Sequence, residues 1–308
     1  MTHHIKAYLA LIGQISIVGL SFLFVKEGLR YTDPFTQLSH RFIIASIGML
    51  VVSMATKQQS TVTVKKMKDL FLLGIFYPVL FFSLQTLSLQ DISTLDAGII
   101  NALNPIILLV LAIFLLRERP SSQQKMVMVL SFVGILAINL SGQQGNATFN
   151  LFGMVLMFLS VLSSGMYTIT ARKIAESYST IEMTKFMLLF GAIVFTVIAF
   201  GQRLFGQVTT SYIEPLVIPN YLITILYLGL LSSLLTSALS NYALHHVKAS
   251  VVALFSNLTP IIVILSGVLI LKEPIKMYQV VGISLIIMPI LSLALLNQFH
   301  KKTRSSES

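Results

Sequence analysis

The stretch Ala97–Leu116, AGIINALNPIILLVLAIFLL, decides the fold class of this chain. It is apolar apart from two asparagines, and charged residues follow only at its end, in Arg117–Arg119. At a rise of about 1.5 Å per residue, a helix of this length spans roughly 30 Å, the thickness of the hydrocarbon core of a bilayer. A helix without a polar face is a membrane span or a deeply buried core helix.

A second stretch, Val251–Leu271, VVALFSNLTPIIVILSGVLIL, repeats this pattern and is followed by Lys272 and Glu273. Three pairs of landmark residues share one offset of 155 positions: Pro105 and Pro260, Glu118 and Glu273, and Gly74 and Gly229. Landmarks that recur at a single offset indicate an internal duplication, which decides how the rest of the sequence is interpreted.

The composition identifies lipid as the solvent of most of the chain. The 308 residues are 55% hydrophobic and only 10% charged, with a mean hydropathy of +0.86, whereas a soluble domain carries about 25% charged residues. The net charge of +10 does not indicate nucleic-acid binding, because the basic residues are scattered between apolar runs. The absence of cysteine excludes a disulfide framework and a cysteine metal site.

Ten apolar runs predict an all-α polytopic membrane protein with ten transmembrane helices. Helices are expected because lipid offers no partner for unpaired backbone groups. The first run lacks a signal-peptide cleavage pattern, so we expect it to be an uncleaved span. The runs cover residues 7–25, 35–55, 70–88, 97–116, 124–141, 151–171, 183–204, 218–243, 250–271 and 277–296.

The basic residues between the runs predict the orientation. With the N-terminus inside, the cytoplasmic segments hold fourteen Lys and Arg residues and the opposite side holds five. Cytoplasmic loops of membrane proteins are enriched in Lys and Arg. We therefore predict a multi-pass protein of the cell (cytoplasmic) membrane with both termini in the cytoplasm.

Ten spans in two copies give five helices per copy, in residues 1–145 and 146–308. Because five is odd, the second copy enters the membrane from the opposite side, which makes an inverted-topology repeat. Proteins of this kind bind a small-molecule substrate near the midplane, between the copies, and work by alternating access. A duplicated scaffold without a substrate path is the alternative.

A set of residues spread over both copies carries a family resemblance: Gly19, Ser21, Phe22, Arg41, Phe42, Asn104, Pro105, Glu118, Thr259, Pro260, Glu273, Pro274 and Gly282. In these residues the chain resembles an EamA-type ten-helix permease of the drug/metabolite transporter superfamily, over essentially its whole length. The resemblance implies a transporter. It leaves the substrate open, because the family spans amino acids, other metabolites and toxic organic compounds.

Pro105 and Pro260 lie in the middle of their runs, where a proline removes a backbone donor and frees the carbonyl four residues earlier. Such backbone is tolerated in a membrane where it is buried in protein or lines a wet cavity. We interpret both prolines as helix kinks along the substrate path, with a packing kink as the alternative. Four polar neighbours at the same depth are candidate cavity-lining residues: Asn101, Asn104, Asn257 and Thr259.

Arg41 is a charge inside the second run, roughly 9 Å from Phe35 along a helix. A charge within a membrane is costly and is a functional hypothesis by default. It could hold a substrate carboxylate, pair with an acidic neighbour, or extend to the membrane surface. His40 beside it is expected to face the surface.

Further polar residues within the runs complete the candidate site: Gln14, Ser21, Gln85, Tyr167 and Asn241. Taken singly, each is better explained as a polar contact between helices. The first run contains no Asp or Glu. Small multidrug exporters of the same superfamily, which resemble this fold, exchange substrate for protons through a buried glutamate there. Proton coupling of that kind is therefore in doubt, and coupling stays open.

Two acidic positions at the ends of runs are expected to be structural. Glu118 and Glu273 lie roughly 20 Å beyond the two prolines along a helix, so they are predicted at the membrane surface, as ion pairs or as tethers between spans. Glu182 and Lys185, three positions apart, are predicted to pair on one helix face.

The sequence contains no catalytic constellation, cofactor motif or metal-ligand set. Its six histidines have no carboxylate at ligand spacing, and the G-x-S-x-G and Walker motifs are missing. We predict a secondary active transporter that exports small metabolites, such as amino acids or similar neutral or zwitterionic solutes, or amphiphilic organic compounds. A non-transporting membrane scaffold or an intramembrane enzyme is the alternative. Substrate, coupling ion, direction of flux and oligomeric state stay open.

Overall fold

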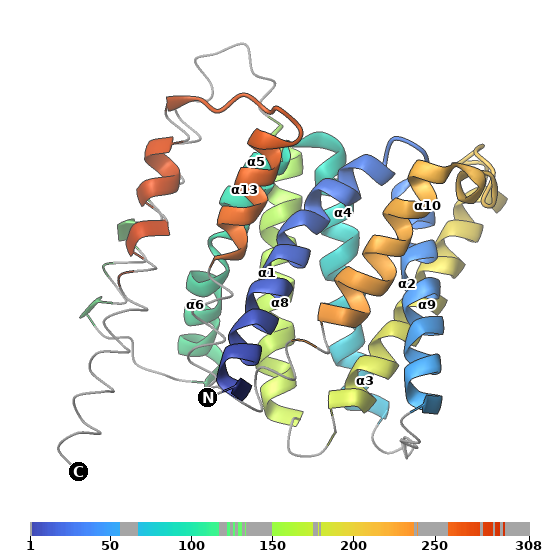
Figure 1. The fold of residues 1–308 in the computed structure, drawn as a ribbon, viewed down its shortest axis with the longest axis horizontal. Coiled ribbons are helices and arrows are strands. Elements are labelled where there is room, and N and C mark those ends of the chain that lie inside the picture. The colour runs from blue at the N-terminus through green and yellow to red at the C-terminus, as the bar shows by residue number, and fades with distance from the viewer. Residues whose placement is uncertain are drawn as a thin grey trace.

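The computed structural model is a bundle of helices (Figure 1). It describes residues 2–55, 67–116, 122–123, 126, 129–130, 133, 150–174, 178, 180–236, 239, 258–277, 280–285, 287–289 and 292. Within these residues every regular element is a helix and no strand occurs. The prediction of an all-α protein is confirmed for this part of the chain.

The helices follow the predicted apolar runs closely. The first half of the sequence, the first copy of the predicted duplication, contains α1 (Thr2–Gly28), α2 (Pro34–Ala55), α3 (Met67–Gly74), η2 (Ile75–Leu80), α4 (Phe81–Asp91), α5 (Thr94–Asn101) and α6 (Asn104–Leu116). The second contains α8 (Leu151–Ile174), α9 (Thr180–Leu204), η3 (Glu214–Val217), α10 (Pro219–Leu226), η4 (Tyr227–Leu235) and α13 (Thr259–Leu269). The predicted run 124–141 lies largely outside the described residues.

Six of the described helical segments are long and apolar enough to cross a membrane. They are Lys6–Gly28, Pro34–Met54, Leu70–Asp91, Thr94–Leu115, Leu151–Ala171 and Ile181–Leu204. Shorter apolar helices cover Pro219–Leu235, Thr259–Leu269 and Val280–Pro289. Large apolar side chains on the outside of the bundle, such as Leu9, Phe114 and Val197, are 61 to 77% exposed. A surface of this kind suits lipid, so the chain is a polytopic membrane protein.

The two copies form one helical bundle with extensive contacts between them. Helix α2 lies along α9, α1 along α13, and α6 along α8 (Figure 1). A buried apolar cluster joins α1, α5, α8 and α13 through Phe22, Leu95, Met157 and Val263. The hydrophobic core is therefore shared between the copies.

Two glycines allow close packing of helices from different copies. A Cβ atom on Gly19 of α1 would lie 2.5 Å from Cγ2 of Ile262 in α13. A Cβ atom on Gly165 of α8 would lie 2.7 Å from Leu111 and 3.4 Å from Ile107 in α6. Ile107 and Ile262 are 155 positions apart. The first helix of each copy thus packs a glycine against the other copy, Gly19 against Ile262 and Gly165 against Leu111 and Ile107.

Two distorted helical segments occur at matching positions of the repeat: η2, where two helices meet at a kink, and η4, which is π-helical. A shift of 155 moves Ile75–Leu80 onto positions 230–235, which lie within Tyr227–Leu235. Tyr77 in η2 has non-helical backbone angles, φ −147° and ψ 109°. Hydroxyl groups of α8 donate to two backbone carbonyls here, Ser163 to Phe76 at 2.9 Å and Ser160 to Phe81 at 2.8 Å. This satisfies polar backbone groups that lipid could not.

Both mid-run prolines lie at the start of a helix. Residues Ala102 and Leu103 interrupt the fourth span, and Pro105 is the second residue of α6, which follows. Pro260 is likewise the second residue of α13. A proline in the first turn has no intrahelical hydrogen bond to lose. The kink expected at Pro105 is therefore a break that precedes the proline, and not a missing bond within one continuous helix.

Candidate functional site

Arg41 is fully enclosed by the protein. It is the eighth residue of α2, and its exposed fraction is 2%. Of the three roles that the sequence left open for this side chain, extension to the membrane surface does not occur in this structure. A guanidinium group so deep in the bundle requires a specific environment.

Two serines of η4 hold the guanidinium group. Nε of Arg41 donates to Oγ of Ser233 at 3.1 Å, and Nη2 donates to Oγ of Ser232 at 3.2 Å. Nη1 is buried and has no partner among the described residues. The approach of η4 to α2 depends on Gly229, because a Cβ atom there would lie 3.0 Å from the carbonyl oxygen of Arg41.

Aromatic rings form the other side of the site. Cζ of Arg41 lies 4.3 Å from the ring centroid of Phe82, a cation–π geometry. The ring of Tyr77 lies 4.9 Å from Phe82 and 4.8 Å from Tyr167 of α8. We call Arg41, Tyr77, Phe82, Tyr167, Ser232 and Ser233 the Arg41 site.

The acidic residues of the sequence lie outside the apolar run that contains Arg41. All eleven acidic residues of the sequence lie outside the ten apolar runs: Glu27, Asp33, Asp69, Asp91, Asp96, Glu118, Glu176, Glu182, Glu214, Glu273 and Glu307. Among the described residues no ion pair involves Arg41. The second role that the sequence left open, pairing with an acidic neighbour, is therefore not seen in the described part of the structure.

The other predicted site residues are more dispersed. Ser21 donates to the carbonyl of Val18 in its own helix. Gln14 in α1 has a buried Oε1 without a partner among the described residues. Gln85 in α4 and Thr259 at the start of α13 are buried, and Asn101 and Asn104 flank the break in the fourth span. Asn241 and Asn257 lie outside the described residues. Only Arg41 and Tyr167 are joined by described contacts, through Phe82 and Tyr77.

Sequence reasoning missed four members of the Arg41 site: Tyr77, Phe82, Ser232 and Ser233. The repeat contains a signal that could have found two of them. Tyr77 follows Gly74 by three positions and Ser232 follows Gly229 by three, so they are equivalent residues of the two copies. A residue with a hydroxyl group three positions after each repeated glycine therefore marks both η2 and η4.

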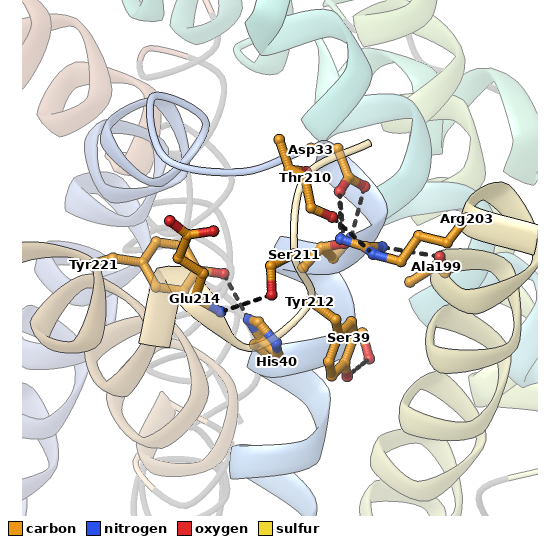
Figure 2. Close-up of polar contacts among 11 residues, drawn as sticks. Asp33, Ser39, His40, Ala199, Arg203, Thr210, Ser211, Tyr212, Glu214 and Tyr221 are labelled. Atoms are coloured by element: carbon orange, nitrogen blue, oxygen red, sulfur yellow. Dashed lines mark hydrogen bonds and ion pairs between the residues drawn. The ribbon is translucent and has the colours of Figure 1, made fainter. Parts of the chain in front are cut away.

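The end of the bundle at which α1 ends and α2 begins, which we call the far end, is joined by polar contacts between the copies (Figure 2). Nη2 of Arg203 in α9 lies 3.4 Å from Oδ2 of Asp33, and Nη1 donates to Oγ1 of Thr36 at 2.8 Å. Nε of Arg203 also donates to the carbonyl of Thr210. The segment that follows α9 is thereby fixed against the start of α2.

His40 is buried at the same end, with an exposed fraction of 3%, so the expectation of a surface-facing histidine is wrong. Its Nδ1 is 2.9 Å from the hydroxyl group of Tyr221. Its ring also packs against Tyr212, at 4.6 Å between centroids, and the Tyr212 hydroxyl is 2.6 Å from Ser39 (Figure 2). The segment between α9 and α10 covers this histidine, an arrangement that local sequence does not reveal.

Glu273 joins α13 to the first copy at the far end. Its carboxylate accepts hydrogen bonds from the backbone N–H groups of Thr94 and Leu95 at 3.0 and 2.9 Å, and from the Thr94 hydroxyl at 2.8 Å. Nζ of Lys26 lies 3.3 Å from the same carboxylate. Burial raises the pKa of Glu273, but these hydrogen bonds and the positive charge of Lys26 outweigh it, so the pKa lies below its usual value.

These contacts agree with the predicted role of Glu273 as a tether between spans. Its repeat counterpart Glu118 lies outside the described residues, as do the neighbouring Arg117 and Arg119. Within the described residues no three His, Asp or Glu side chains gather as metal ligands would.

Comparison with known proteins connects this architecture to transport. The model of the EamA-like transporter family matches residues 5–140 and again residues 151–295. The chain is 38% identical to the uncharacterized transporter YcxC of Bacillus subtilis (strain 168), over 90% of this chain and 88% of the relative. It is 30% identical to the uncharacterized transporter YetK of the same organism, over 91% and 84%.

A solved crystal structure shares the fold. It aligns with a TM-score of 0.65 and 16% sequence identity, over 94% of this chain and 96% of that chain. The family matches cover both halves of the sequence, and the two relatives are named as transporters. The chain therefore belongs to the EamA-like transporter family, and it is a multi-pass membrane transporter rather than an enzyme.

Proposed function

We propose that the protein is a secondary active exporter of small organic molecules that works by alternating access. The substrates are small metabolites, such as amino acids or similar neutral or zwitterionic solutes, or amphiphilic organic compounds. The charge-poor interior supports such solutes over multivalent ions. The acidic residues of the sequence all lie outside the apolar runs. Burying several uncompensated charges of a ligand among these runs would be costly.

The observation that carries this proposal is that Arg41 contacts both η4 and α4, the helix that directly follows η2. Distorted helices at equivalent positions of two repeats are typical of transporter substrate sites, which lie where the repeats meet. Here η4 supplies Ser232 and Ser233 to the guanidinium group, and η2 leads into α4, whose Phe82 ring packs against the same group. A rocking motion of the copies would therefore change the contacts that Arg41 makes with the second copy.

The underlying architecture that we propose is ten transmembrane helices in two inverted five-helix copies, residues 1–145 and 146–308. The two separate family matches and the exchanged glycine–isoleucine contacts of Gly19 and Gly165 support it. The distribution of basic residues supports a location in the cell membrane with both termini in the cytoplasm. The lining that we propose includes Gln14, Ser21, Gln85, Asn101, Asn104, Asn241, Asn257 and Thr259 besides the Arg41 site.

The experiment that tests transport is counterflow in proteoliposomes with labelled amino acids, organic acids and lipophilic cations, with and without a pH gradient. We expect one class to accumulate, and a response to the gradient would establish proton coupling. Replacement of both Asn101 and Asn257 by Leu should abolish uptake while the protein still folds. Failure of every compound to move would favour the membrane scaffold, and normal transport in the double variant would remove these two residues from the site.

A further inference from the structure

We propose that the substrate carries a single carboxylate and that Nη1 of Arg41 binds it. The preferred ligand is a small organic monocarboxylate with an apolar or aromatic body, in its anionic form. This inference rests on the proposed transport function and narrows its substrate class. It follows from the charge, the free donor and the rings that meet at the Arg41 site.

The charge balance of the membrane interior is the first argument. Arg41 is buried, and no acidic residue of the sequence lies within an apolar run. Asp33, which directly precedes α2, is about 12 Å from Arg41 along the helix axis. Its carboxylate is already bound to Arg203 and Thr36. A buried charge without a counter-ion is unfavourable, so an anionic ligand would remove a cost that a neutral or cationic ligand leaves in place.

The donor arrangement is the second argument. Ser232 and Ser233 accept from Nη2 and Nε and so fix the plane of the guanidinium group. Nη1 is buried and has no partner among the described residues. A guanidinium group forms strong, directional, charge-assisted hydrogen bonds with carboxylates. The serines thus leave one end of the group available for an anion.

The rings define what the rest of the ligand is like. Phe82 lies against the guanidinium group, and Tyr77 and Tyr167 extend the aromatic surface away from it. Such a surface binds apolar or flat groups. No acidic residue within the runs is available for a ligand ammonium group. The site therefore favours a monocarboxylate over the matching amino acid, and disfavours the matching amine because of like-charge repulsion.

Four probes of one size test the inference: 3-phenylpropionate, its amide, 3-phenylpropylamine, and phenylalanine, which adds an ammonium group to the first. Binding to the purified full-length protein is measured by ligand-dependent thermal stabilisation in detergent. We expect 3-phenylpropionate to bind roughly tenfold or more tightly than its amide, as charge-assisted hydrogen bonds predict. Phenylalanine should bind more weakly than 3-phenylpropionate, and the amine should not stabilise the protein.

Variants separate the role of Arg41 from unspecific effects of charge. Arg41→Gln should remove the preference for the carboxylate over the amide, while Arg30→Gln, which removes an exposed guanidinium at the end of α1, should keep it. If Arg41→Gln does not fold, the Ser232→Ala/Ser233→Ala variant takes its place and should reduce the preference. Equal binding of carboxylate and amide by the wild-type protein, or no carboxylate binding, overturns the inference.

Counterflow with the same four probes distinguishes the inference from the function on which it rests. Movement of the probes without regard to charge would overturn the carboxylate site and leave the transport function intact. Binding of 3-phenylpropionate through Arg41 without any movement would support the site and contradict transport.

Discussion

Glu273 shows how one side chain can hold distant parts of this protein together. It accepts hydrogen bonds at the start of α5 and pairs with Lys26 at the end of α1. Hydrogen bonds to a charged group contribute about 1.5–3 kcal/mol. We therefore expect Glu273→Gln to lower the free energy of unfolding at neutral pH by on the order of 2 kcal/mol, measured by thermal or denaturant unfolding followed by circular dichroism.

The pH dependence of this effect has a definite sign. The pKa of Glu273 is lowered in the folded protein, so its stabilising contribution is complete above the usual value of 4.5 and is lost as the pH falls through the folded pKa. The difference between wild type and Glu273→Gln should accordingly shrink below pH 4.5. Glu27→Gln is the control, because the pair of Glu27 with the exposed Arg30 contributes at most about 1 kcal/mol. A difference that does not change with pH would contradict this assignment.

Gly229 is the residue on which the approach of η4 to α2 depends. A Cβ atom there would lie 3.0 Å from a backbone oxygen and 2.8 Å from Cγ2 of Ile44, and the backbone cannot move aside easily. We expect Gly229→Ala to destabilise the protein by about 1–3 kcal/mol through overpacking and to weaken substrate binding at Arg41. Gly201→Ala is the matched control, since no atom of the described residues lies within 4 Å of its added Cβ. A helical Gly→Ala change there should stabilise by about 0.5–1 kcal/mol.

At the scale of elements, the distorted segment η2 depends on hydroxyl groups from α8. Ser163 donates to the carbonyl of Phe76, next to the non-helical residue Tyr77. We expect Ser163→Ala to cost about 1–3 kcal/mol, because it leaves a buried carbonyl without this donor. Thr170→Ala on the same helix should cost less, since Thr170 donates to the carbonyl of Met166 in its own helix. Equal losses in the two variants would show that η2 does not need the hydroxyl group of Ser163.

The helices themselves were largely predictable, but their distortions were not. Hydropathy predicted the spans because a run of about 20 apolar residues is long enough to cross a bilayer as a helix. It could not predict the kink within Ile75–Leu80 or the π-helical bonding of Tyr227–Leu235, since an ordinary α-helical span is equally apolar. The break in the fourth span was expected at Pro105 and occurs just before it, at Ala102 and Leu103.

For the molecule as a whole, the sequence predicted the membrane class and the family, and it marked Arg41 as a candidate site residue, since a charge in an apolar run stands out in any sequence. The surroundings of Arg41 could not be predicted in the same way. Ser232 and Ser233 resemble ordinary contact residues between helices, and only the packing of the second copy on the first brings them to α2. The buried state of His40 likewise depends on Tyr212 and Tyr221, which lie more than 170 positions away in the sequence.

The far end offers a test of alternating access for the whole molecule. Two ion pairs join the copies there, Lys26 with Glu273 and Asp33 with Arg203, so this end must open if the copies rock against each other. The chain contains no cysteine, and cysteine pairs can be introduced without removing native thiols. We expect a short bismaleimide across Asp33→Cys/Arg203→Cys to stop counterflow, whereas each single variant treated in the same way should remain active. The matched control is Glu27→Cys/Arg30→Cys, an ion pair at the same end but within the first copy, between the end of α1 and the turn that follows it; its cross-link should leave transport unchanged. Undiminished counterflow in the cross-linked Asp33–Arg203 variant would mean that the substrate path does not require the far end to open.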